Sequence, residues 1–178
     1  MKRQKVLPRS FYARPAVKVA RDLLGKTIEH AGRSGRIVEV EAYLGEGDEA
    51  AHSARGITPR TRVIFGPPGH AYVYFIYGMH YCLNLVAERE GKAGCVLIRA
   101  LEPLRGTRMP CNGPARLTRA LGITLEQNGA DLTRGDIRVL ENENGEALLI
   151  RTSPRIGISK STDLRLRFFL AGNPFVSR

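Results

Sequence analysis

Two glutamates, Glu39 and Glu41, are the first residues in this sequence whose type and spacing suggest chemistry. They lie in the segment 37–44 (IVEVEAYL), whose alternating apolar residues predict a strand. Strand geometry places them on one face with Ile37 and Tyr43, and the opposite, apolar face then consists of Val38, Val40, Ala42 and Leu44. Two carboxylates on one face raise each other's pKa when partly buried, and such pairs suit acid–base catalysis at a glycosidic bond. A solvated strand face with ordinary surface glutamates accounts for the same pattern.

Metal chemistry is not expected from the histidines and cysteines. Glu49 and His52 have the E-x-x-H spacing of a di-metal helix, but that site needs a second copy and the sequence has none. The three cysteines form no C-x-x-C pair, which excludes a zinc knuckle and favours a reducing compartment. We therefore expect no metal and no cofactor.

Tyrosines cluster in the next part of the chain. In the segment 71–77 (AYVYFIY), Tyr72 and Tyr74 share one face of a predicted strand, and Tyr77 stands at a turn beside Gly78 and Met79. In a basic protein such tyrosines can stack on bases or wedge a duplex open, although a half-buried tyrosine-rich strand explains them too. Arg99, within the apolar run 94–101 (GCVLIRAL), requires an anionic partner if it is buried, and Glu41 is a candidate.

The charge balance favours a polyanionic partner. The chain has 178 residues and a formal net charge of +11, and its 28 basic residues comprise 22 arginines and six lysines. Arginine is the better bidentate ligand for phosphate, so nucleic acid is the first candidate partner. The segment 37–54 is the exception, because it carries five acidic residues and no Lys or Arg, which points to a task other than holding phosphates.

The elements that must position these residues are predicted as a mixture of helices and strands. We expect helices after Pro15 and from Pro114 to Gly122, a hairpin from the runs 71–77 and 81–87, and further strands at 35–45, 94–101, 146–152 and 166–171. The fold class is therefore α+β: a single compact domain over residues 1–178 with a curved, mainly antiparallel sheet, a protruding β-hairpin and a few helices. No secretory signal or membrane-spanning run is found.

Several long motifs resemble one known family. The segments 37–53 (IVEVEAYLGEGDEAAHS), 58–84, 95–104 (CVLIRALEPL), 112–117 (NGPARL) and the C-terminal tail are similar, in order, to the alkyladenine (3-methyladenine, methylpurine) DNA glycosylases. The resemblance implies an enzyme of base-excision repair that flips a damaged purine out of duplex DNA and hydrolyses its N-glycosidic bond, leaving an abasic site. The substrates it implies are 3-methyladenine, 7-methylguanine, hypoxanthine and ethenoadenine.

The resemblance also implies a role for individual residues, and it favours Glu41 over Glu39. Glu41 matches the general base that activates water, and Arg99 and the carbonyl of Ile156 match groups that hold this water. Base binding is implied for Tyr43, His52, Tyr74 and Asn84, and intercalation into DNA for Tyr77 with Met79 beside it. The loop 157–166 and His80 depart from the family pattern.

Two other functions compete with this one: a non-catalytic nucleic-acid binder, and a nucleoside or sugar hydrolase that uses the glutamate pair on a small substrate. The acidic segment argues against the first and the basic excess against the second. No lysine lies between residues 27 and 91 to act as a Schiff-base nucleophile, so we expect a monofunctional glycosylase. We expect a monomer that acts on double-stranded DNA containing damaged purines, without a membrane partner, in a bacterial cytoplasm at the nucleoid.

Overall fold

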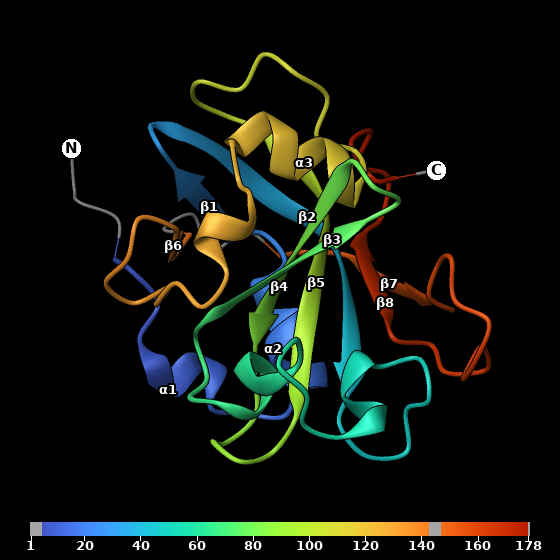
Figure 1. Cartoon of the computed structure of the whole chain (residues 1–178). Helices are drawn as coiled ribbons and strands as arrows, with labels where there is room; N and C mark the ends of the chain where they lie inside the picture. The colour runs from blue at the N-terminus through green and yellow to red at the C-terminus, as the bar shows by residue number, and fades with distance from the viewer. Residues whose placement is uncertain (1–4, 143–146, 178) are drawn as a thin grey trace.

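A strand of 12 residues, β2 (Arg33–Leu44), lies at the centre of the sheet in the computed structural model, which describes residues 5–142 and 147–177 (Figure 1). One edge of β2 pairs with β5 (Gly94–Pro103) along almost its whole length, and the other edge pairs with β1 (Thr27–His30) and then with β8 (Arg167–Leu170). Beyond β5, the sheet continues through β4 (His80–Val86) and β3 (Ala71–Ile76). Beyond β1, it continues through β6 (Arg138–Leu140), and β7 (Ile150–Ser153) pairs with β8. All these pairs are antiparallel.

The helices pack on this sheet with one apolar side each. The helix α2 (Ala16–Leu23) begins directly after Pro15 and buries Ala16, Val19, Ala20 and Leu23, and it contacts β2 and β5. The helix α3 (Pro114–Leu121) contacts β4 and β5, and Gly122 ends it in the left-handed conformation with φ +71°. The short helices are α1 (Arg9–Tyr12) and the 3-10 helices η1 (His52–Arg55), η2 (Arg62–Phe65) and η3 (Leu125–Gln127). The predicted α+β class and both predicted helices are confirmed.

The predicted hairpin is also confirmed. The strands β3 and β4 pair in register from Ala71↔Leu85 to Ile76↔His80, and residues 77–79 connect them. Tyr77 and Gly78 both have positive φ, +51° and +67°, and the Met79 N–H donates to the Ile76 carbonyl at 3.3 Å. The two positive φ values match a type I′ turn, which suits the right-handed twist of the paired strands.

The alternation predicted for residues 37–44 is interrupted by a bulge. Between Ile37 and Val40 the pairing with β5 shifts twice, and Arg99 is skipped because Glu39 pairs with Ala100 and Val40 with Ile98. Ile37 was expected on the face of the glutamates, and this prediction is wrong: Ile37 packs in the main core with Val38 and Val40. The register shift is the physical reason, since one additional residue moves the following side chains to the other face.

Two further predictions concern the ends of the sheet. The strand expected at 146–152 is found at Ile150–Ser153, and its predicted start, residue 146, lies outside the described residues. The strand expected at 166–171 is found as β8. In the described part of the chain, no helix is long and apolar enough to cross a membrane.

Candidate active site

A cavity of about 540 Å³ opens between the hairpin, η1 and the segment that follows β7. Its lining includes most of the residues singled out in the sequence, although they are far apart in the chain: Tyr43, His52, Tyr72, Tyr74, Tyr77, Asn84, Arg99 and Ile156. The residues 157–160 complete one wall. Residues from motifs that are separate in the sequence therefore line one cavity.

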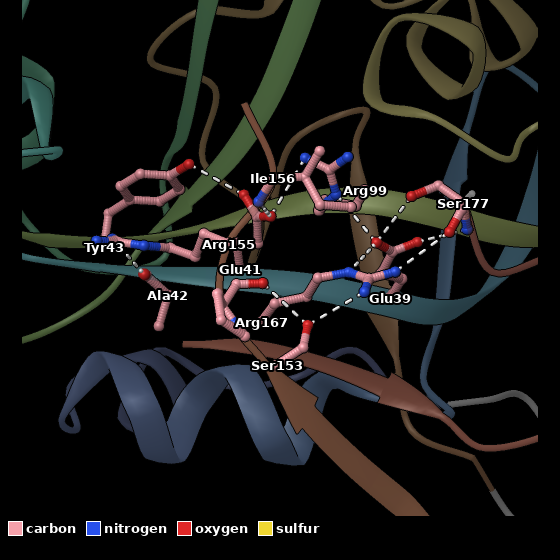
Figure 2. A network of polar contacts seen from close by, with 11 residues as sticks. Glu39, Glu41, Ala42, Tyr43, Arg99, Ser153, Arg155, Ile156, Arg167 and Ser177 are labelled. Carbon is pink, nitrogen blue, oxygen red and sulfur yellow. Dashed lines mark hydrogen bonds and ion pairs between the residues drawn. The ribbon is translucent and has the colours of Figure 1, made fainter. Parts of the chain in front are cut away.

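Glu41 lies directly behind this lining and is fully buried. The Tyr43 hydroxyl donates to its Oε2 at 3.0 Å, the Ile156 N–H donates to its Oε1 at 2.7 Å, and the Arg99 guanidinium lies 3.3 Å from Oε1 (Figure 2). Burial raises the pKa of Glu41 above its ordinary value, although Arg99, Ile156 and Tyr43 each favour the ionised form. The interpretation of Glu41 as an ordinary surface glutamate is wrong, whereas the predicted contact with Arg99 is confirmed.

Glu39 is also fully buried, but its environment differs from that of Glu41. It accepts hydrogen bonds from Arg99 Nε at 3.0 Å, from Arg167 Nε at 2.7 Å, and from both the N–H and the hydroxyl of Ser177. Of these three partners only Arg99 lines the cavity. The structure therefore separates the two carboxylates: Glu41 is next to the cavity wall and Glu39 faces the C-terminal tail.

Three aromatic rings form one wall of the cavity. The rings of His52 and Tyr74 are 4.6 Å apart between centroids, and those of Tyr72 and Tyr74 are 5.4 Å apart. His52 Nδ1 lies 2.9 Å from the Tyr72 hydroxyl, which also accepts a hydrogen bond from Arg60 Nε at 3.2 Å. Burial and the nearby charge of Arg60 lower the pKa of His52 to about 4. His52 is therefore neutral at pH 7, so it adds no positive charge to the cavity.

Asn84 has a fixed orientation in the cavity. It is buried, and its side-chain amide donates to the Tyr72 carbonyl at 3.2 Å. The Cys95 thiol lies 3.8 Å from the side-chain oxygen of Asn84. These contacts hold the amide plane, so Asn84 presents a defined polar edge to a molecule in the cavity.

Tyr77 and Met79 project from the tip of the hairpin. Tyr77 is 87% exposed and Met79 is 70% exposed, and Tyr77 also contributes to the mouth of the cavity. For Tyr77, the interpretation as part of a half-buried strand is therefore wrong. A large aromatic residue in a left-handed conformation with most of its surface in solvent gains little from packing, which points to contact with a partner.

Asp48 and Arg155 form a buried ion pair that the motifs did not single out. Arg155 NH1 and NH2 lie 2.6 and 2.7 Å from the two carboxylate oxygens of Asp48, and neither side chain is exposed. Burial opposes ionisation of Asp48, but the contacts of Arg155 and the backbone N–H groups of Leu44 and Ala50 together outweigh it, and the pKa of Asp48 is lowered. The Arg155 guanidinium lies 4.5 Å from the centroid of the Tyr43 ring. Arg155 therefore supports Tyr43 and places the adjacent Ile156 N–H at Glu41.

Lys160 is a second residue that the motifs missed. It lines the cavity from the loop that departs from the family pattern, and its Nζ lies 3.3 Å from the Glu49 carboxylate. Only the position of the loop in the fold could reveal this lysine. Among residues 5–142 and 147–177, no three His, Cys, Asp or Glu side chains come together as metal ligands.

Comparisons with known proteins identify the family of the chain. The family model described as methylpurine-DNA glycosylase (MPG) matches residues 10–174. The chain belongs to the methylpurine-DNA glycosylase family. It is a DNA N-glycosylase, a hydrolase of the repair pathway for alkylated purines.

Relatives of this glycosylase cover almost its full length. A protein of Methanoculleus marisnigri is 50% identical, and the match covers 97% of this chain and 98% of the relative. Proteins of Chlorobaculum tepidum and Koribacter versatilis are 50% and 48% identical, over 98% and 96% of this chain and 91% and 92% of theirs. The names of all three contain the words 3-methyladenine DNA glycosylase.

Proposed function

We propose that this glycosylase flips an alkylated or deaminated purine out of double-stranded DNA and releases it by hydrolysis, with Glu41 as general base. The substrates are 3-methyladenine, 7-methylguanine, hypoxanthine and ethenoadenine, and the product is an abasic site. The observation that carries the proposal is the fully buried Glu41 immediately behind an aromatic cavity of about 540 Å³. The family match over residues 10–174 supports one glycosylase domain across the chain.

In the proposed reaction, Glu41 accepts a proton from water as the water oxygen bonds to C1′ and the bond from C1′ to the purine nitrogen breaks. Arg99 and the Ile156 carbonyl hold this water, because both residues line the cavity and both contact Glu41. The raised pKa of Glu41 makes it a stronger base than an exposed glutamate. The carboxylate also stabilises the positive charge that develops on the sugar in the transition state.

The aromatic residues Tyr43, His52 and Tyr74 hold the flipped base in this proposal. N-alkylation at position 3 or 7 gives the purine a positive charge, and tyrosine faces attract a cationic ring by about 0.5–2 kcal/mol. A neutral His52 can lie against such a base without charge repulsion. The resemblance to the family implies that its backbone N–H contacts the base edge. Asn84 disfavours unmodified guanine, because its fixed amide meets the 2-amino group. 7-Methylguanine has the same amino group, but its cationic ring is a better leaving group and is released despite this contact.

The hairpin tip holds the gap that the flipped nucleotide leaves. Tyr77 enters the duplex from the minor groove, with Met79 beside it, since both are exposed at the turn. We propose a monomeric, monofunctional enzyme, in which the Lys160 amine remains paired with Glu49 and forms no Schiff base with the sugar.

The direct test is incubation with duplexes that carry one hypoxanthine, ethenoadenine or 7-methylguanine, followed by alkali, with the undamaged duplex as control. Strand scission at the lesion only after alkali is the expected result, because alkali cleaves an abasic site. Scission without alkali would contradict the monofunctional assignment. Retardation of the duplex on a gel without scission would contradict catalysis and favour a nucleic-acid binder.

A further inference from the structure

Glu39 is a buried carboxylate that the proposed reaction does not use. It lines no part of the cavity, yet Arg99, Arg167 and Ser177 converge on it (Figure 2). Its Oε1 accepts from Arg99 Nε, Arg167 Nε and the Ser177 hydroxyl at 3.0, 2.7 and 2.8 Å, and its Oε2 accepts from the Ser177 N–H at 2.6 Å. All four groups donate, and two of them belong to guanidinium groups that are permanently charged. This environment suits an ionised carboxylate.

Arg99 connects this group to Glu41. Its Nε donates to Glu39 while its NH1 lies 3.3 Å from Glu41 Oε1, and its side chain is only 9% exposed. Arg99 is also the residue that the pairing of β2 with β5 skips. Bulges occur next to active sites, where they change the direction of a side chain. One guanidinium is therefore shared between two buried carboxylates, and it reaches both from a bulge.

We propose that Glu39 is a positioning residue of the glycosylase reaction, which holds Arg99 by Nε so that NH1 is presented to Glu41. Glu39 is fixed in turn by Arg167 on β8 and by Ser177 near the end of the chain. The C-terminal tail thereby supports the general base from behind the cavity. This inference rests on the proposed role of Glu41.

The charges around Glu41 determine in which direction its pKa should change when Glu39 is replaced. Glu41 is faced by Tyr43 and Glu39 on its own strand, by Arg99 on β5, by the Ile156 N–H, and by the thiol of Cys82 and the guanidinium of Arg155. Arg99 lowers the pKa of Glu41, whereas Glu39 raises it. Without Glu39, the like-charge repulsion disappears, but Arg99 also loses the contact that holds its guanidinium at Glu41. The effect of Arg99 on the pKa of Glu41 is the larger of the two, so its loss outweighs the lost repulsion and raises the pKa of Glu41.

The test is the pH profile of single-turnover excision by the variant Glu39→Gln. Excision requires ionised Glu41, so the rate rises with pH through the pKa of Glu41. In the variant, the midpoint of this rise moves to higher pH by on the order of one unit, and the plateau rate stays within about tenfold of the parent. A shift to lower pH would show the loss of like-charge repulsion alone, with Arg99 still in place, and would overturn the proposal. A lower melting temperature with an unmoved midpoint would mean that Glu39 acts on folding alone and would overturn the proposal.

Asp131→Asn is the matched control. Asp131 pairs with Arg9 at 2.5 Å and does not line the cavity, so the loss of this ion pair should affect stability and leave the midpoint in place. An equal shift in Asp131→Asn would overturn the proposal, because the shift would then not be specific to Glu39.

Two further variants keep the test decisive. If Glu39→Gln does not fold, the double variant Glu39→Gln/Arg167→Gln replaces it. The double variant removes one charge of each sign and so preserves the net charge of the group. We expect its midpoint to shift in the same direction as that of Glu39→Gln. An unmoved midpoint in that variant overturns the proposal. Full excision by Glu41→Gln would refute the proposed function itself. If Glu41→Gln is inactive but the midpoint of the Glu39 variant does not move, only the positioning role is refuted.

Discussion

At the scale of single residues, the chemistry depends on how burial and charge are balanced around Glu41. Burial favours its protonated form, while Arg99, the Ile156 N–H and the Tyr43 hydroxyl favour its anion. A carboxylate with a raised pKa and several donors can exist as an anion at neutral pH and still take a proton from water. In the proposed mechanism, this balance makes Glu41 the base.

The sequence predicted this glutamate only in part. Alternation marked Glu39 and Glu41 equally, and the resemblance to the family selected Glu41. The alternation could not show the bulge at Glu39, nor could it show that Arg99 contacts both carboxylates, because both depend on the register between β2 and β5. Asp48 and Arg155 are 107 residues apart, so no local pattern could connect them.

His52 gives a prediction at this scale. Its pKa of about 4 results from burial and from the charge of Arg60, so the ring should stay neutral as the pH falls from 7 to 5. The titration of its ring protons by NMR measures this directly. The variant Arg60→Gln removes one of the two causes and should raise the midpoint. A midpoint near 6.5 in the parent protein would show that the ring is exposed to water rather than packed against Tyr72 and Tyr74.

At the scale of elements, the hairpin and the central strands were predictable because their signals are local. Apolar alternation and the Gly78 turn marked β2, β3 and β4, and Pro114 with Gly122 marked α3. The strands β1 and β6 were not predicted, because they have only four and three residues and include polar side chains. The strand β1 pairs with Arg33–Arg36 in a local hairpin. The strand β6 pairs with β1 and lies against Lys5 and Val6, and a local pattern does not encode this pairing between distant segments.

The hairpin tip gives the prediction that belongs to this scale. Tyr77→Asn places Asn-Gly at a turn with two positive φ values, where that pair is preferred, so the melting temperature should be retained or raised. Lesion binding and excision from a well-paired site should fall, because base–aromatic stacking of about 1–3 kcal/mol is lost. The loss should shrink when the lesion lies opposite a mismatch, where flipping costs less. Tyr77→Ala should show the same pattern of excision.

Single-turnover excision on paired and mispaired lesions, with thermal unfolding alongside, measures this effect. Leu149→Ala is the control, since Leu149 is another exposed apolar residue, 69% exposed, and does not line the cavity. An unchanged ratio of the paired to the mispaired rate, together with a large drop in melting temperature, would show that Tyr77 stabilises the fold and does not act on DNA.

At the scale of the whole molecule, the acidic segment 37–54 is largely internal. Three of its five carboxylates, Glu39, Glu41 and Asp48, are buried and contact Arg99, Arg155 or Arg167. These acidic residues do not oppose a polyanion at the surface, which explains how a protein of net charge +11 can carry an acidic segment. The distribution of charge along the sequence indicated that the acidic segment has a task other than holding phosphates. Only the fold shows that three of its carboxylates are buried and so kept away from the surface.

The basic excess predicts a steep dependence of DNA binding on salt. Each Lys or Arg that contacts a phosphate releases counterions, and the slope of log K against log salt is about −0.9 for each such contact on duplex DNA. Titration of an undamaged duplex at several salt concentrations measures this slope. A flat plot would show that the basic residues do not serve DNA binding.

The central claim is that Glu41 activates the water that releases the base, and the variant Glu41→Gln tests it most directly. Glutamine keeps the shape of the side chain but cannot accept the proton, so lesion binding should persist while single-turnover excision falls by at least about 100-fold, the lower range for a general base. The measurement is excision from a duplex with one lesion under enzyme excess, with lesion affinity determined in parallel. Excision within tenfold of the parent would contradict this mechanism.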